Sequence, residues 1–319
     1  MNYISFPGLG IKEFALDPEA FSLFGRPVMW YGVIISFAMI LAVLYVLYRA
    51  KHNENIKQDD VFDHAIWAIL FGVIGARLYY VIMEFDEYKG ETVLETLKNS
   101  IAIWEGGLAI YGGIIAGLIA IAVVSHFKKI KLGKTLDMVA PAVMIAQAIG
   151  RWGNFFNAEA HGGPTTLPWR MGIRGDEFPT TAYVHPTFLY ESLWNVLGFI
   201  LINLFYKKKK YDGQIVVMYF TWYGFGRMII EGLRTDSLYV GSFRISQVIG
   251  FLCFFFGACF LTAMEIVLRL RKKDAVTVNE AEAEAADEKK EEIKEESESE
   301  KKDDGVFEIA DSYADDDDE

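Results

Sequence analysis

Cysteine is nearly absent from this chain: among 319 residues there are only two, Cys253 and Cys259, and both lie in one apolar run. Two cysteines placed in this way provide neither a disulfide framework nor a cysteine-based metal site. We therefore interpret them as small apolar residues that pack within the run.

Histidine is also scarce, and its five occurrences are scattered along the sequence. No HExxH pattern occurs, and no GxSxG or Walker element stands in a suitable context. These absences argue against a metal site and against common nucleophile and nucleotide-binding motifs. The N-terminus lacks a basic stretch followed by an apolar core, so we predict no cleavable signal peptide.

What the sequence has in excess is long apolar runs without charge, and 52% of its residues are hydrophobic. The run VMWYGVIISFAMILAVLYVLY is long enough to cross hydrocarbon as a helix. Backbone groups in lipid must bond internally, and these runs are too long for barrel strands. We predict an all-α polytopic membrane protein with seven transmembrane helices, at about residues 28–48, 61–84, 104–126, 136–150, 186–206, 213–231 and 243–268. The third run is rich in glycine, which lets membrane helices approach closely.

Negative charge is concentrated at the C-terminus. The chain has a net charge of −12, but residues 274–319 contain 21 acidic residues and 5 lysines, so residues 1–273 carry about +4. The C-terminal segment has few large apolar residues and repels itself. We predict a membrane domain over residues 1–273 and a disordered or only transiently helical tail over residues 274–319.

Lysine and arginine gather in alternate loops, which predicts the orientation of the chain. The basic segments are 49–60, 127–135, 207–210 and 269–273, whereas segments 85–103 and 232–242 contain few basic residues. Cytoplasmic loops collect these residues. Seven spans with the N-terminus outside place all four basic segments and the tail in the cytoplasm. Segment 151–185, with several prolines and glycines, is then expected to form a small irregular extracytoplasmic cap.

Several polar side chains nevertheless lie within or beside the apolar runs. A charged side chain at the centre of a membrane helix costs about 2.5–3.5 kcal/mol, so such residues usually carry function. Three of them are spaced i, i+4 and i+7 and therefore share one helix face. Others follow the fourth run in the segment GRWGNFFNAEAHGG. The set consists of Arg77, Glu105, Arg151, Asn154, Asn157, Glu159, His161, Arg227, Glu231 and Arg234.

Most of these groups fall at the extracytoplasmic ends of the predicted spans. The fork of donors on arginine matches phosphate oxygens, and a phospholipid headgroup is the anion most available at that depth. We therefore predict a headgroup site in which arginines bind phosphate and carboxylates hold the arginines. Internal pairing, of Arg227 with Glu231 and of Arg151 with Glu159, is the alternative that the residues leave open.

The segment GRWGNFFNAEAHG resembles the G-R-x-G-N-F-x-N-x-E-x-x-G signature of the prolipoprotein diacylglyceryl transferase family. Every fixed position agrees, from Gly150 to Gly162. Further stretches similar to the same family are WYGVIISF, GARLYYV, WEGGLAIYGG, HPTFLYES and GFGRMIIEGLRTD. The likeness covers about residues 20–270 and leaves out the acidic tail.

This resemblance implies an enzyme of the bacterial plasma membrane, with residues 1–273 as its catalytic domain. Such enzymes transfer the diacylglyceryl group of phosphatidylglycerol to the lipobox cysteine of prolipoproteins and release glycerol phosphate. The implied partners are phosphatidylglycerol, prolipoprotein signal peptides with a lipobox cysteine, and membrane lipid. No metal, organic cofactor or nucleic acid is expected.

The resemblance also implies roles for particular residues. Arg151 would bind the headgroup, and Arg227 and Arg234 would stabilise charge on the departing phosphate. The remaining implied residues orient these groups or complete the phosphatidylglycerol site; they are Tyr31, Arg77, Asn154, Asn157, Glu159, Gly162, His185 and Glu231. Some relatives have a histidine where this chain has Tyr111. The general base therefore stays open: Tyr111 accepts the proton, Tyr111 only positions the substrate, or His161 replaces it.

Two other classes of protein compete with this interpretation. A transporter or channel for an anionic solute also places arginines among helices, but it predicts polar residues deep along several spans. A non-catalytic phospholipid-binding scaffold explains a headgroup site but not the thirteen-residue motif. No internal repeat is evident, which weakens the transporter interpretation.

Overall fold

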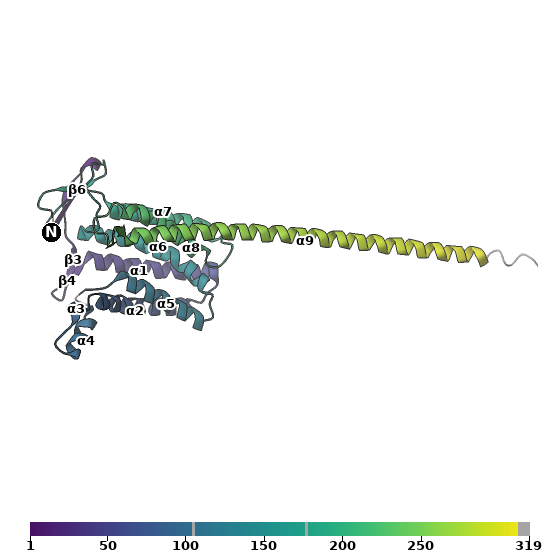
Figure 1. Ribbon diagram of the computed structural model, residues 1–319, viewed down its shortest axis with the longest axis horizontal. Coiled ribbons are helices and arrows are strands. Elements are labelled where there is room, and N and C mark those ends of the chain that lie inside the picture. The colour runs from purple at the N-terminus through teal and green to yellow at the C-terminus, as the bar shows by residue number, and fades with distance from the viewer. Residues whose placement is uncertain (104–105, 176–177, 312–319) are drawn as a thin grey trace, which may run out of the picture. The chain divides into compact units, whose positions relative to one another are not determined.

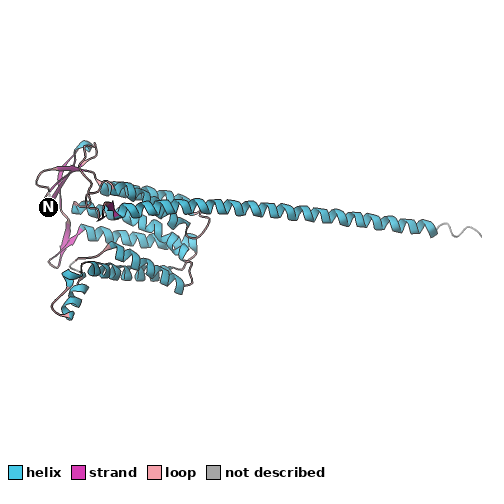
Figure 2. Ribbon diagram, in the orientation of Figure 1, coloured by secondary structure: helices cyan, strands magenta, loops and turns pink. Residues whose placement is uncertain are grey.

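The computed structural model describes residues 1–103, 106–175 and 178–311, so Glu105 lies outside the described residues. The chain divides into two compact units, Met1–Leu261 and Thr262–Glu319. The first unit is a bundle of helices with strands and short helices gathered at one end (Figures 1 and 2). We call this the cap end, and we call the opposite end, with the loops at 50–57, 128–131 and 207–213, the loop end.

Among the described residues, seven long helices correspond in order to the seven predicted spans. Six of them are long and apolar enough to cross a membrane, whereas α8 is 18 residues long and carries charged side chains in its last turns. The helices are α1 Trp30–Arg49, α2 Gln58–Met83, α5 Ile110–Phe127, α6 Leu132–Asn157, α7 Thr187–Tyr206, α8 Gln214–Glu231 and α9 Ile245–Asp311. The backbone of α9 is helical into the acidic segment, and disorder of that segment in solution stays a prediction.

The glycine-rich third span becomes α5, which packs closely on α2. A Cβ atom added to Gly112 would collide with the backbone oxygen of Gly75. Glycine at these positions lets the two backbones approach within contact distance. The helix begins later than predicted, at Ile110, because Gly106 and Gly107 adopt positive φ angles of 92° and 72° that break a helix.

Helices α7 and α8 are joined by two stacked indoles. The rings of Trp194 and Trp222 lie 4.2 Å apart and 12° from parallel. Each Nε1–H donates to the backbone oxygen of the other residue at 3.0 Å. Gly198 and Gly226 leave room for the rings, because a Cβ atom at either position would overlap the facing indole. These contacts fix the register of α7 against α8.

The fourth span is longer than predicted. Helix α6 runs from Leu132 to Asn157 and includes Pro141, whereas the sequence indicated a span over residues 136–150. The motif that we expected to follow the span therefore lies mostly on its final turns. The helix ends at Ala158, which adopts a left-handed conformation with φ of 53°.

The cap end contains regular strands, although the prolines and glycines of segment 151–185 predicted an irregular cap. Four antiparallel strands form a sheet in the order β2-β1-β5-β6. The sheet forms because alternate side chains of β1 and β5 bury Ile4 and Ile173 against Phe188 in the first turn of α7. The strands are β1 Asn2–Phe6, β2 Ile11–Leu16, β5 Met171–Arg174 and β6 Ala182–Val184, with hairpins β3 Glu19–Leu23 to β4 Arg26–Met29 and β7 Tyr239–Val240 to β8 Phe243–Arg244.

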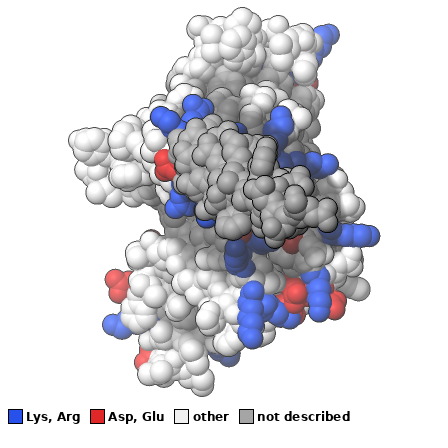
Figure 3. Space-filling view, turned by 90° about the vertical axis from the view of Figure 1, so that its right-hand side faces the viewer, with Lys and Arg blue, Asp and Glu red and all other residues white. Residues whose placement is uncertain are grey.

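Basic side chains gather at the loop end, which faces the viewer in Figure 3. Ion pairs connect the three basic segments of the first unit to neighbouring segments. They join Lys128 to Asp60 at 3.0 Å, Lys131 to Asp212 at 3.5 Å, and Lys209 to Glu54 at 2.5 Å. Segments 49–60, 127–135 and 207–210 therefore share one end of the bundle.

A buried ion cluster at the loop end was not predicted. The ammonium group of Lys209 lies 2.5 Å from Glu54 and 3.1 Å from Asp137, and we call these residues the Lys209 cluster. Asp137 is fully buried and also accepts hydrogen bonds from the backbone N–H groups of Gly213 and Val216, where α8 begins. Burial opposes the charge of Lys209, but its hydrogen bonds to the two carboxylates outweigh burial and raise its pKa.

Candidate active site

Three separate parts of the chain meet at the cap end through backbone hydrogen bonds. The N–H of Gly162 donates to the oxygen of His185 at 2.9 Å, and the N–H of Gly163 donates to the oxygen of Leu233 at 2.9 Å. Gly162 also forms an antiparallel bridge with Arg234. These bonds hold the segment after α6, the start of α7 and the segment after α8 side by side.

The close contacts at this junction require glycine. A Cβ atom on Gly162 would lie 2.7 Å from the Cβ of His185 and 2.9 Å from the oxygen of Leu233. The neighbouring Gly163 has more room, because the nearest atom to its Cβ would be 4.0 Å away. On α6, the ring of Tyr31 lies 2.8 Å from the position of a Cβ on Gly153, so Tyr31 packs directly against the motif.

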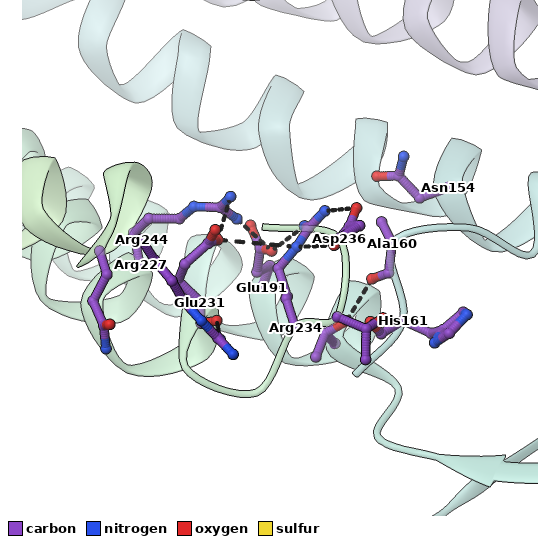
Figure 4. A network of polar contacts seen from close by, with 12 residues as sticks. Asn154, Ala160, His161, Glu191, Arg227, Glu231, Arg234, Asp236 and Arg244 are labelled. Atoms are coloured by element: carbon purple, nitrogen blue, oxygen red, sulfur yellow. Dashed lines mark hydrogen bonds and ion pairs between the residues drawn. The ribbon is translucent and has the colours of Figure 1, made fainter. Parts of the chain in front are cut away.

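A single carboxylate lies at the centre of the polar residues. Glu191, on the first turns of α7, places Oε2 at 2.6 Å from Nη2 of Arg151. Its Oε1 lies 2.8 Å from Nη1 of Arg227 and 3.1 Å from Nη1 of Arg234 (Figure 4). The Glu191 side chain is only 3% exposed. We call these four residues the arginine cluster.

Two further carboxylates surround the arginine cluster. Glu231 approaches Arg227 at 2.5 Å. Asp236 accepts two hydrogen bonds from Arg234, at 3.0 Å from Nε and 2.6 Å from Nη2. Arg244, where α9 begins, donates to the backbone oxygen of Glu231. Glu231 is thus closest to Arg227, with Arg234 at 3.9 Å, and Asp236 pairs with Arg234.

The pairing of Arg234 with Asp236 keeps both groups charged. Burial opposes ionisation of Asp236, but the hydrogen bonds and charge of Arg234 outweigh it and lower the pKa of the carboxyl. Burial likewise opposes the charge of Arg234, and its contacts with Asp236 and Glu191 raise its pKa. The guanidinium is therefore a permanent cation at this site.

Arg151 connects the cluster to the polar end of the motif. Its Nη1 donates to Oδ1 of Asn154 at 3.3 Å, and Nδ2 of Asn154 donates to Oε1 of Glu159 at 2.8 Å. The carboxylate that pairs with Arg151 is therefore Glu191, with Asn154 standing between Arg151 and Glu159. The alternative of internal pairing holds for Arg227 with Glu231.

The charges of this site balance, which allows it to lie among apolar helices. Arg151, Arg227 and Arg234 face Glu191, Glu231 and Asp236, and unpaired charges would be costly in such surroundings. Arg151 is the most accessible arginine, with 21% of its side chain exposed against 14% and 10% for the others. In its described contacts Nη1 donates to Asn154 and Nη2 forms an ion pair with Glu191, which leaves further N–H groups that can bind an anion.

Arg77 lies in a different environment from these arginines. It is 5% exposed, and its guanidinium packs over the ring of Tyr88 at 4.6 Å. Its nitrogens donate at 2.7–3.0 Å to the backbone oxygens of Asn99, Ser100, Gly106 and Gly107. Arg77 thus fixes the segment between α2 and α5.

The remaining predicted residues lie at or near the ends of helices, and their described contacts do not involve the arginine cluster. Tyr111 is half-buried in the first turn of α5, and Asn157 is half-buried where α6 ends. His161 donates from Nδ1 to the oxygen of Gly162 at 3.1 Å, and Figure 4 shows its ring directed away from Glu191. The imidazole of His185 contacts the hydroxyl of Tyr190 at 3.3 Å.

Sequence reasoning missed Glu191, Asp236 and Arg244. Glu191 carried a readable signal, because it is a carboxylate inside a predicted span, where a charge is costly unless it is used. Asp236 lies in the short segment between two predicted spans and carries no such signal, and Arg244 is only the second residue of the last predicted span, where a charge is common. Their partners are set by how that segment folds back on α8.

Comparison with known proteins identifies the family of the chain. The family model of prolipoprotein diacylglyceryl transferase matches residues 18–263. Similar proteins, each named phosphatidylglycerol–prolipoprotein diacylglyceryl transferase, come from Listeria innocua, with 46% identity over 77% of this chain and 88% of the relative, and Finegoldia magna, with 47% over 73% and 90%. A third, from Streptococcus pneumoniae, is 43% identical over 84% of this chain and 99% of its own length. The chain therefore belongs to the prolipoprotein diacylglyceryl transferase family.

Proposed function

We propose that this membrane transferase moves the diacylglyceryl group of phosphatidylglycerol to the thiol of a prolipoprotein lipobox cysteine, with the arginine cluster as its phosphate site. The names of the relatives supply these two substrates. The observation that carries the proposal is that three guanidinium groups converge on Glu191 at one end of the apolar helices. Guanidinium forks match the oxygens of a phosphodiester.

In the proposed reaction, the cysteine sulfur attacks the carbon of the diacylglyceryl group that is bonded to the phosphate oxygen. A carbon–sulfur bond forms and the carbon–oxygen bond breaks, with its electron pair leaving on glycerol phosphate. The thiol proton passes to a base, since the thiolate is the reactive form. The phosphate gains one negative charge in this step, and cations already held in place stabilise such charge most effectively.

The residues divide this work according to their positions. Arg151, the most exposed, binds the phosphate of the headgroup, while Arg227 and Arg234 stabilise its developing charge. Asn154 and Glu231 hold these arginines in place. We propose that the headgroup site is completed by Tyr31, Asn157, Glu159, Gly162 and His185, and that Arg77 supports it by holding the segment before α5.

The general base is Tyr111 or His161. Replacing Tyr111 by phenylalanine removes only the hydroxyl, so it tests the first alternative directly. If the variant transfers lipid at the wild-type rate, the Tyr111 hydroxyl takes no part in the mechanism. A loss of lipid transfer in a His161→Gln variant would then assign the base to His161.

We also propose that the cap end faces outward and that the acidic tail is cytoplasmic. Three basic segments share the loop end, and cytoplasmic loops are rich in lysine and arginine. This orientation places the arginine cluster on the side where secreted prolipoproteins emerge.

The test is lipid transfer by purified protein in vesicles that contain phosphatidylglycerol, with a lipobox peptide as acceptor. We expect the peptide cysteine to gain the mass of a diacylglyceryl group. Arg151→Ala should reduce the rate by about 10²–10³-fold, because the phosphate that Arg151 binds gains charge in the reaction, and this is the usual cost of removing one group that contacts such charge. The matched control is Arg174→Ala, since Arg174 pairs with Glu13 on the exposed sheet at 2.6 Å. If the peptide stays unmodified and anionic solutes cross the vesicle membrane, the result would instead support a transporter.

A further inference from the structure

A small helix stands at the edge of the cap end, beside the end of α2 (Figure 1). This helix is α4, Val93–Ile101, and it follows the short helix α3, Phe85–Tyr88. Its start is capped, because Oγ1 of Thr92 accepts from the N–H of Glu95 at 3.2 Å. The carboxylate of Glu95 accepts in turn from the N–H of Glu91 at 3.0 Å. These two bonds stabilise the start of a helix that is too short to form alone.

The apolar face of α4 points away from the protein. Leu94, Leu97 and Ile101 are spaced i, i+3 and i+7 on one face, and they are 73%, 56% and 59% exposed. Val93 beside them is 88% exposed. The half-buried residues of the helix are polar, such as Thr96, which binds the backbone of the preceding loop. A helix in water shows the reverse arrangement, so water is not the environment that this face fits.

Arg77 fixes α4 against a membrane helix. From α2 it donates to the oxygens of Asn99 and Ser100 at 2.8 and 2.9 Å, which are carbonyls of the last turn of α4. Cations at this position satisfy the unpaired carbonyls of a helix end. Arg77 lies six residues before Met83, where α2 ends, which is about 9 Å along the axis. The end of α4 is therefore attached to α2 at a point inside a candidate span, about 9 Å before the end of that span at the cap end.

The surface next to this attachment is also apolar. The last turns of α2 expose Leu78 by 58% and Ile82 by 61%, and α2 is one of the candidate membrane spans. Lipid covers such a surface in a bilayer. The exposed face of α4 is thus attached to a segment that lipid already surrounds.

We propose that α4 is an interfacial helix whose apolar face lies in the acyl-chain region of the bilayer surface at the cap end. Lys98, which is exposed on α4, reaches the headgroups above. Arg77 also binds the oxygens of Gly106 and Gly107, so it braces α4 against the segment that leads into α5. The occupant of the apolar face is lipid, and this holds whichever substrates the enzyme uses.

The test is a depth measurement on full-length protein reconstituted in phospholipid vesicles. Cys253 and Cys259 are first replaced by alanine, and a nitroxide is then attached at Leu97→Cys. The matched control is Glu91→Cys, an exposed polar position just before the helix. We expect the label at position 97 to collide more with oxygen than with a water-soluble nickel chelate, at a depth of about 5–10 Å below the headgroup boundary. The label at position 91 should show the opposite preference.

Two results would overturn the proposal. Equal nickel accessibility at positions 97 and 91 would place the apolar face in water. Protection of position 97 only after addition of a lipobox peptide would assign the face to the peptide rather than to lipid.

Discussion

The Lys209 cluster provides a sharp test of how this bundle is held together. Replacing Lys209 by methionine keeps most of the side-chain volume but removes the cation that faces two carboxylates. The side chains of Glu54 and Asp137 are 2% and 0% exposed, so loss of the ammonium group leaves two buried carboxylates, of which Glu54 keeps the hydroxyl of Tyr206 at 3.1 Å. Removing one partner of a buried pair costs about 3–5 kcal/mol.

The lower end of that range applies here, because Asp137 keeps its bonds to the backbone at the start of α8. A loss of about 3 kcal/mol corresponds to a fall in Tm of roughly 4–6 °C for a protein of this size. Thermal unfolding in detergent, followed by circular dichroism, measures it. Lys208→Met is the matched control, since Lys208 is exposed and adjacent. Adding Glu54→Gln to the Lys209 variant should restore part of the loss.

The Lys209 cluster also predicts how stability depends on pH. The pKa of Lys209 is raised in the folded protein, so its contribution to stability is fully present below the ordinary lysine value of about 10.4. That contribution is lost as pH rises through the higher folded value. The gap between wild type and Lys209→Met should therefore close only in strong alkali. Equal Tm values for Lys209→Met and Lys208→Met at neutral pH would refute the reasoning.

Three further predictions concern the cap end and the tail. Glu191→Gln leaves three arginines without their shared carboxylate. Transfer of lipid to a peptide should therefore fall by about 10²-fold, the usual cost of disturbing groups that are held in place to stabilise the transition state. A wild-type rate would contradict the central position of Glu191. Gly162→Ala should lower both activity and Tm, because its Cβ would overlap His185, whereas Gly163→Ala has room and serves as the control. Truncation before Asp274 should leave transfer unchanged, and a loss of activity in that variant would assign the acidic tail a function.

The membrane helices were predictable because hydrocarbon requires long apolar runs, and such runs are visible in a sequence. The ends of the helices were less predictable. α6 continues through Pro141 and beyond residue 150, and α5 starts after Gly107, because local backbone conformation sets these limits. The strands of the cap were missed because β1 and β5 are short and far apart in the chain. They pair only once the bundle brings them together.

The site was predictable in its composition but not in its connections. The motif and the i, i+4, i+7 spacing identified Arg151, Arg227 and Arg234, which the structure brings to one carboxylate. That carboxylate, Glu191, belongs to another helix, and no spacing rule relates positions on separate helices. Arg77 shows the same limit, since its partners are backbone oxygens, which every residue possesses.

The stacked indoles of Trp194 and Trp222 give this enzyme a mechanical property that matters for its redesign. They set how far α7 slides along α8 by aromatic stacking and reciprocal donation to the backbone, without any formal charge. The register of α7 against α8 thus does not depend only on the ion pair between Glu191 and Arg227. Charged residues of the arginine cluster can therefore be substituted to change lipid preference while the indole contacts between α7 and α8 are kept.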